Sequence, residues 1–168
     1  MPAKRTLALV VRPVEVFETS LVATLFTREL GKVDALAKGA RRPKSAFQGG
    51  LDLLGVSDIV VFPKASEALD LLVEAAPIER FASLRRDLAA LYAGFYIAEL
   101  LNDLTDLHDP HPRLFDAARI TLRHLGETDL RSRRHASSNL RTLRGRNSAS
   151  PRCRKVILAA SNSLGCGS

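Results

Sequence analysis

The stretch KVDALAKGARRPKSAFQGG, residues Lys32–Gly50, begins as a strand pattern and ends as a loop rich in positive charge. Four cations lie within seven residues of this stretch, with no acid among them: Lys38, Arg41, Arg42 and Lys44. Glycine and proline between these cations interrupt any helix or central strand, so we expect the charges to lie on a solvated loop. Such a loop predicts a polyanionic partner, and nucleic acid is the natural one.

Strand patterns flank this basic loop on both sides. The segments are Thr6–Arg12 (which Pro13 is expected to end), Leu21–Arg28, Val33–Lys38, Val56–Phe62 and Leu69–Ala75. The second of these also fits a short helix, but the turn-like Glu29–Lys32 that follows favours a hairpin. Five strands with two hairpins and a long loop predict a closed barrel of the oligonucleotide-binding (OB) type, because closure removes exposed edges. An open sheet packed on helices is the alternative.

Helical periodicity replaces the strand pattern from Ser83 onward. Apolar residues recur at three- and four-residue spacing as far as Leu104, which predicts a long helix that Ser83 caps and that is buried around most of its girth. A second amphipathic helix is expected from Pro112 until Gly126 stops it. The expected fold class is α+β, with an N-terminal five-stranded OB barrel in residues 1–80 and a helical domain in residues 81–130.

Charge is distributed unevenly along the 168 residues. The formal net charge is +7, yet residues 1–130 hold 16 Lys+Arg and 18 Asp+Glu, whereas residues 131–168 hold 9 Lys+Arg and no acid. This basic, Arg/Ser-rich tail has no aromatic residue and no sustained periodicity, so we expect it to be disordered. No apolar run is long enough to cross a membrane, and the first strand does not fit a leader peptide, so a cytoplasmic protein is expected.

The other candidate sites are weaker than the basic loop. His108 and His111 lie among aspartates, but a Pro-punctuated connection favours a polar turn over a metal site. Motifs of phosphate-binding loops, metalloproteases and serine hydrolases are absent from the sequence, so we expect no enzyme. Phe47 is the one aromatic residue beside the loop cations. It either stacks on a base or closes the end of the barrel, and the sequence does not decide between these alternatives.

Three strings together resemble the family of the bacterial DNA repair and recombination protein RecO. They are LVATLFTRELGKVDALAKGARRPKSAFQGGLDLL (residues 21–54), LRRDLAALYAGFYIAELLNDLT (84–105) and HPRLFDAARITLRHL (111–125). The resemblance covers about residues 5–127, and TRELGK…KGARRPKS is its most specific part. It implies an OB domain followed by a helical domain, in a recombination mediator of the RecF pathway that performs no catalysis.

The resemblance also implies partners and a site. Members of this family bind single- and double-stranded DNA, anneal complementary strands and, with RecR, help load RecA onto DNA coated by the single-stranded-DNA-binding protein SSB. The acidic, apolar C-terminal tail of SSB would dock on the helical domain, and the protein would be associated with the nucleoid. The DNA-binding cations of the OB domain correspond here to Lys38, Arg41, Arg42 and Lys44, with Arg28 and Lys32 as weaker candidates.

The tail departs from the family pattern. Many members carry a four-cysteine zinc module after the second helix, whereas residues 131–168 contain only Cys153 and Cys166, so we expect neither zinc nor another cofactor. Because every acid disappears after Asp129, we hypothesise that the tail is an out-of-frame translation product and that the helical domain is truncated. If the gene were resequenced and no shifted base were found near codon 130, the out-of-frame hypothesis would be contradicted. The alternative function is a non-catalytic protein-interaction scaffold that no longer supports repair.

Overall fold

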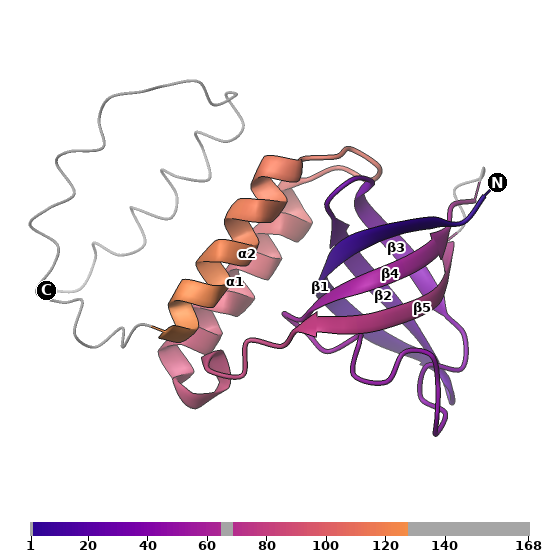
Figure 1. Ribbon diagram of the computed structural model, residues 1–168, viewed down its shortest axis with the longest axis horizontal. Coiled ribbons are helices and arrows are strands. Elements are labelled where there is room, and N and C mark those ends of the chain that lie inside the picture. Colours follow the sequence, from indigo (N-terminus) through magenta and orange to yellow (C-terminus); the bar gives the residue numbers. More distant parts are fainter. Residues whose placement is uncertain (1, 65–68, 128–168) are drawn as a thin grey trace, which may run out of the picture. The chain divides into compact units, whose positions relative to one another are not determined.

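The computed structural model describes residues 2–64 and 69–127, in which strands come first and helices follow (Figure 1). The strands are β1 (Lys4–Phe17), β2 (Ser20–Thr27), β3 (Gly31–Ala37), β4 (Val56–Phe62) and β5 (Asp70–Glu79). A short 3-10 helix, η1 (Leu84–Arg86), precedes the helices α1 (Leu88–Leu104) and α2 (Pro112–Glu127). None of the helices in this described part is long and apolar enough to cross a membrane.

The strands close into a barrel in the order β1-β2-β3-β5-β4. Neighbouring strands are antiparallel except for the pair that completes the barrel, in which Ala35–Ala37 of β3 run parallel to Asp70–Leu72 of β5. Every second residue of β3 is buried, because successive side chains of a strand point to opposite faces. The predicted α+β fold class, with an N-terminal five-stranded barrel of the OB type and a helical part after it, is confirmed.

Two strands are longer than predicted, and both continue past a proline. The prediction that Pro13 ends the first strand is wrong, because β1 continues to Phe17. The prediction that the fifth strand ends at Ala75 is also wrong, because β5 continues to Glu79. β4 pairs with β1 only up to Leu9, so at Pro13 the strand pairs with β2 alone. Similarly, β3 pairs with β5 only up to Leu72, so at Pro77 that strand pairs with β4 alone. A proline is tolerated at such a one-sided position because no ladder hydrogen bond is lost there.

The first long helix also differs from its prediction. It begins at Leu88, and the Asp87 carboxylate caps it by accepting a hydrogen bond of 2.9 Å from the Ala89 N–H. Ser83 makes no capping bond and precedes η1 instead. The expected burial around most of the girth is wrong, because Leu88 and Tyr92 are 67% and 63% exposed. The buried residues of α1 are mostly small, namely Ala90, Gly94, Ala98 and Leu101.

These small residues let α1 approach its neighbours closely. A Cβ placed on Gly94 would lie 2.8 Å from Leu54 Cδ1 and 3.5 Å from Leu122 Cδ2. The loop before β4, helix α1 and helix α2 therefore meet at this glycine. The apolar face of α1 divides accordingly: its small side packs against the rest of the fold, whereas Leu88 and Tyr92 face solvent.

Candidate nucleic-acid interface

The loop between β3 and β4 follows a fixed course across one end of the barrel. Near its beginning, the Arg41 N–H donates to the Thr19 carbonyl at 3.1 Å, beside the β1–β2 turn. Farther along, the Ala46 carbonyl accepts a hydrogen bond of 3.2 Å from the Ala75 N–H of β5. Gly39 has a φ of 71°, a conformation that favours glycine, and it turns the chain out of β3 into the loop. The backbone therefore positions the four loop cations.

All four predicted loop cations are exposed: Lys38, Arg41, Arg42 and Lys44. Arg41 Nη1 donates to Glu15 Oε2 at 2.7 Å, and both side chains are well exposed. A pair of this kind contributes at most about 1 kcal/mol, so a phosphate can replace the carboxylate. Within the described ranges no carboxylate pairs with any of the other three. The loop therefore presents three cations that are free to meet an anion.

Phe47 lies on the same loop but points into the barrel. Its side chain is 6% exposed and belongs to the core cluster that the strands enclose. Of the two alternatives for this residue, the structure shows the closure of the barrel. The assignment of Phe47 to DNA binding is corrected accordingly, since a ring buried in this way has no free face on which a base could stack.

The weaker candidates, Arg28 and Lys32, lie away from the basic loop. Arg28 forms a two-pronged ion pair with Asp116 of α2, with Nε–Oδ1 and Nη2–Oδ2 distances of 3.0 and 3.1 Å. Lys32 Nζ donates to the Asn102 carbonyl of α1 at 2.5 Å. Both cations lie near the turn of the β2–β3 hairpin, whereas the basic loop leaves from its open end. Their observed contacts join the barrel to the helices.

A second ion-pair group between barrel and helices was not predicted from the sequence. Glu79, at the end of β5, accepts hydrogen bonds on Oε1 from Arg119 Nε at 2.9 Å and from Arg123 Nη2 at 2.7 Å. The hydrogen bond from Arg119 holds the pKa of Glu79 below its ordinary value of 4.5; Arg123 adds to this effect, and partial burial opposes it. The Arg28 hydrogen bonds likewise hold the pKa of Asp116 below its ordinary value of 3.8.

Stability is expected to fall in acid because of these carboxylates. A depressed pKa in the folded state contributes stability that is fully present above the unfolded value and is lost as the pH falls through the folded value. We expect the urea midpoint to drop as the pH falls below about 4.5. Glu79→Gln should lower the midpoint at neutral pH, and its difference from the unaltered chain should shrink in acid. Glu99→Gln, at an exposed position, is the control; a Glu79→Gln deficit that stays constant with pH would contradict this prediction.

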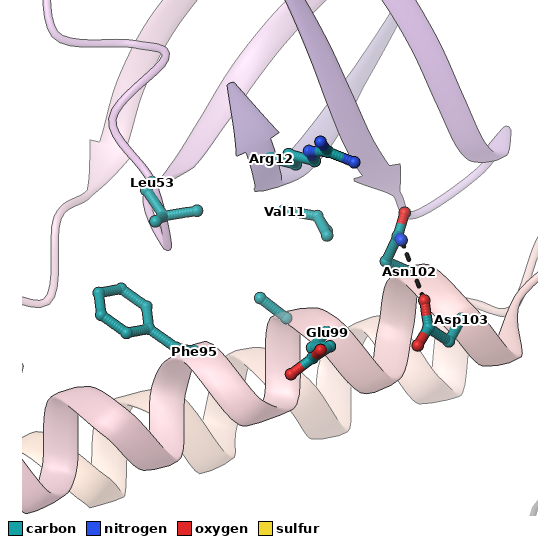
Figure 2. Close-up of a pocket in the computed structure, with 8 residues that line it drawn as sticks. Val11, Arg12, Leu53, Phe95, Glu99, Asn102 and Asp103 are labelled. Atoms are coloured by element: carbon teal, nitrogen blue, oxygen red, sulfur yellow. Dashed lines mark hydrogen bonds between the residues drawn. The ribbon is translucent and has the colours of Figure 1, made fainter. Parts of the chain in front are cut away.

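A pocket of about 410 Å³ lies between β1 and α1 (Figure 2). Its lining is of mixed charge and partly apolar: Val11, Arg12, Leu53, Phe95, Ala98, Glu99, Asn102 and Asp103. Figure 2 shows the Asn102 amide turned toward Asp103, to whose Oδ1 it donates at 3.1 Å. With more acids than cations on its walls, this pocket does not suit a polyanion.

The remaining predictions concern metals and the tail. His111 Nε2 lies 3.0 Å from Asp109 Oδ2, which makes it part of the polar connection between the helices. The part of the chain that the structure covers contains no group of three or more potential metal ligands. The predicted disorder of residues 131–168, their out-of-frame origin and the missing zinc module lie outside the described residues.

The fold and the loop together define the class of protein. It is an OB-fold barrel with exposed cations on one loop and an appended helical pair. Residues 1–81 match the family model for the N-terminal part of recombination protein O, and residues 85–143 match the model for its C-terminal part. The chain belongs to the RecO family.

Curated relatives of this chain carry the name DNA repair protein RecO. The protein of Rhodopirellula baltica is 49% identical over 123 residues, which are 73% of this chain and 44% of that protein. The protein of Salinibacter ruber is 40% identical over 111 residues, 66% of this chain and 43% of that protein. The chain thus spans less than half the length of these relatives.

Proposed function

We propose that this chain is a non-catalytic mediator of DNA repair and recombination, whose basic loop binds the phosphates of single-stranded DNA. Family membership supports the role in repair. The observation that carries the binding mode is the set of three exposed loop cations that no carboxylate of the described residues pairs with, next to an Arg41–Glu15 pair that a phosphate can open. With Phe47 buried, binding is electrostatic and indifferent to base sequence, because no aromatic ring of the loop stacks on a base.

Neutralised phosphates also explain how such a protein would anneal strands. Two complementary strands repel each other through their phosphates, and bound cations reduce that repulsion. The same loop would accept double-stranded DNA through its phosphates. Resemblance to the RecO family further supports RecR and the C-terminal tail of SSB as partners, assistance in loading RecA, and association with the nucleoid.

A scaffold without a DNA-binding role is the second candidate. The exposed apolar side of α1, on which Tyr92 and Phe95 are in edge-to-face contact with ring centroids 6.3 Å apart, favours it. In that case the loop cations would serve solubility alone, and their removal would leave DNA binding unchanged.

Neutralising the loop separates the two candidates. When the logarithm of the affinity for single-stranded DNA is plotted against the logarithm of the salt concentration, each phosphate contact contributes about −0.7 to the slope. Four contacts therefore give a slope of about −3. We expect the variant Lys38→Gln/Arg42→Gln/Lys44→Gln of the full chain to bind a single-stranded oligonucleotide with a slope shallower by about 2. Fluorescence anisotropy across a salt series measures the slope for the variant and for the unaltered chain. Both proteins carry the same tail cations, so the contribution of the tail cancels in the difference between the two slopes.

Arg113→Gln is the matched control for this experiment. Arg113 is an exposed cation on the first turn of α2, next to the connection that packs on the turn of the β2–β3 hairpin, away from the basic loop. Its removal should leave the slope within a few tenths of the unaltered value. If the loop variant and this control behaved alike, the loop would not be the DNA site, and the scaffold would be the better description.

A further inference from the structure

The linker between β5 and α1, residues 80–87, carries a second group of cations. Arg80, Arg85 and Arg86 are all exposed, and within residues 2–64 and 69–127 no carboxylate forms an ion pair with them. The acids at the two ends of the linker are engaged elsewhere. Glu79 is held by two arginines of α2, and Asp87 caps α1. The linker therefore presents uncompensated positive charge.

Arg80 brings this charge to the far end of the basic loop. Its guanidinium lies against the backbone of Gly49, where a Cβ would be 2.9 Å from Arg80 Cζ and would collide with Nη2. Gly49 has a φ of 71°, so this position favours glycine on conformational grounds, and the absent Cβ leaves room for the Arg80 guanidinium. The loop and the linker, separated by some thirty residues of sequence, are thus in direct contact.

The two groups of cations lie within reach of one ligand. A chain extends at most about 3.6 Å per residue, so Lys44 lies within about 18 Å of Gly49, and Arg86 within about 22 Å of Arg80. A single strand of several nucleotides covers such distances, and OB folds occupy about 4–16 nucleotides. Cations distributed over such a length favour an extended anionic ligand over a small one, because one chain of phosphates can neutralise several of them.

We propose that Arg80, Arg85 and Arg86 extend the phosphate-binding surface of the basic loop, so that one single strand of DNA passes from the loop across Gly49 to the linker. In Figure 1 this linker leaves the end of β5 and leads into α1. The inference rests on the proposed function, because the loop supplies the first part of the path. It adds a second set of contacts that longer strands reach and very short ones do not.

Salt slopes measured with two oligonucleotide lengths test the inference in the full chain. With about 16 nucleotides, Arg80→Gln/Arg85→Gln/Arg86→Gln should have a slope shallower by about 2 than the unaltered chain, three contacts at about 0.7 each. With about four nucleotides the difference should largely disappear, because a short strand occupies the loop alone. Arg113→Gln is again the control, and circular dichroism confirms that the exposed substitutions leave the fold intact.

The outcomes separate this inference from the proposed function. Suppose that the linker variant had the same salt slope as the unaltered chain, while the loop variant had a shallower slope. The extended path would then be overturned, and the loop site would stand. If the slope of the linker variant were shallower by the same amount with the long and the short oligonucleotide, the path from loop to linker would also be overturned. The linker cations would then bind DNA without the additional length that the path requires. If neither variant changed the slope, or the unaltered chain bound no DNA, the proposed function and this inference would both fail.

Discussion

Phe115→Ala is expected to lower the free energy of unfolding by about 3–5 kcal/mol, a typical cost for removing a fully buried phenylalanine. Phe115 of α2 and Phe26 of β2 are both 0% exposed, and their ring centroids are 6.2 Å apart. The ring thus fills the space between helix and barrel, and its loss would leave a cavity there. Since small domains are stable by only about 5–15 kcal/mol, the variant should lose a large part of its stability.

Urea denaturation followed by circular dichroism measures this effect, and Phe95→Ala provides the control. Phe95 undergoes the same chemical change, but its side chain is 38% exposed and borders the pocket between β1 and α1. We expect it to cost about 1 kcal/mol, because much of the ring is already in contact with water. Equal losses in the two variants would show that Phe115 does not hold the helices to the barrel in solution.

The strands could be predicted from the sequence because their signals are local. Short β-branched runs separated by turn residues indicate strands wherever they occur, and β4 was predicted with its observed bounds, Val56–Phe62. The lengths of β1 and β5 could not be predicted in the same way. Whether Pro13 or Pro77 ends a strand depends on which neighbour lies on each side, and that is a property of the closed barrel.

In the candidate site, too, the features that depend on local sequence could be predicted, whereas those that depend on distant residues could not. Exposure of the cations at 38–44 follows from glycine and proline in the loop itself, and the structure agrees with it. The surroundings of Arg28 and Lys32 depend on partners 88 and 70 residues away, Asp116 and Asn102. Similarly, the contact of Arg80 with Gly49 exists only once β5 has closed the barrel. Local patterns identify exposed cations but cannot say which of them a group distant in the sequence will contact.

Gly31→Ala is expected to cost about 2–5 kcal/mol, through backbone strain and overpacking together. Gly31 has a φ of 75° at the β2–β3 turn, and a Cβ there would lie 2.5 Å from both the backbone nitrogen and the carbonyl carbon of Asp109. A rigid backbone cannot move aside as a flexible side chain can. The α1–α2 connection should therefore lift away from the barrel, and the hydrogen bond of 2.9 Å from the His108 N–H to the Lys32 carbonyl should break.

Gly39→Ala isolates the steric part of this effect. Gly39 has a nearly equal φ of 71°, but the atoms nearest to a Cβ there belong to the flexible Arg42 side chain, the first of them at 3.4 Å. The strain of about 1–2 kcal/mol is therefore common to both variants, and the excess in Gly31→Ala measures the collision with Asp109. Amide hydrogen exchange should show lost protection at His108 in Gly31→Ala alone; equal stability losses, or an intact His108 amide, would contradict the predicted collision.

The same variant tests whether docking of the helices and phosphate binding are separate properties. Gly31 lies at the turn of the β2–β3 hairpin, and the basic loop leaves from its opposite end. At temperatures where Gly31→Ala remains folded, its salt slope for single-stranded DNA should equal that of the unaltered chain, because the loop cations are untouched. A changed slope would mean that the docked helices hold the loop in its binding conformation, and that Arg28 and Lys32 influence DNA binding through that contact.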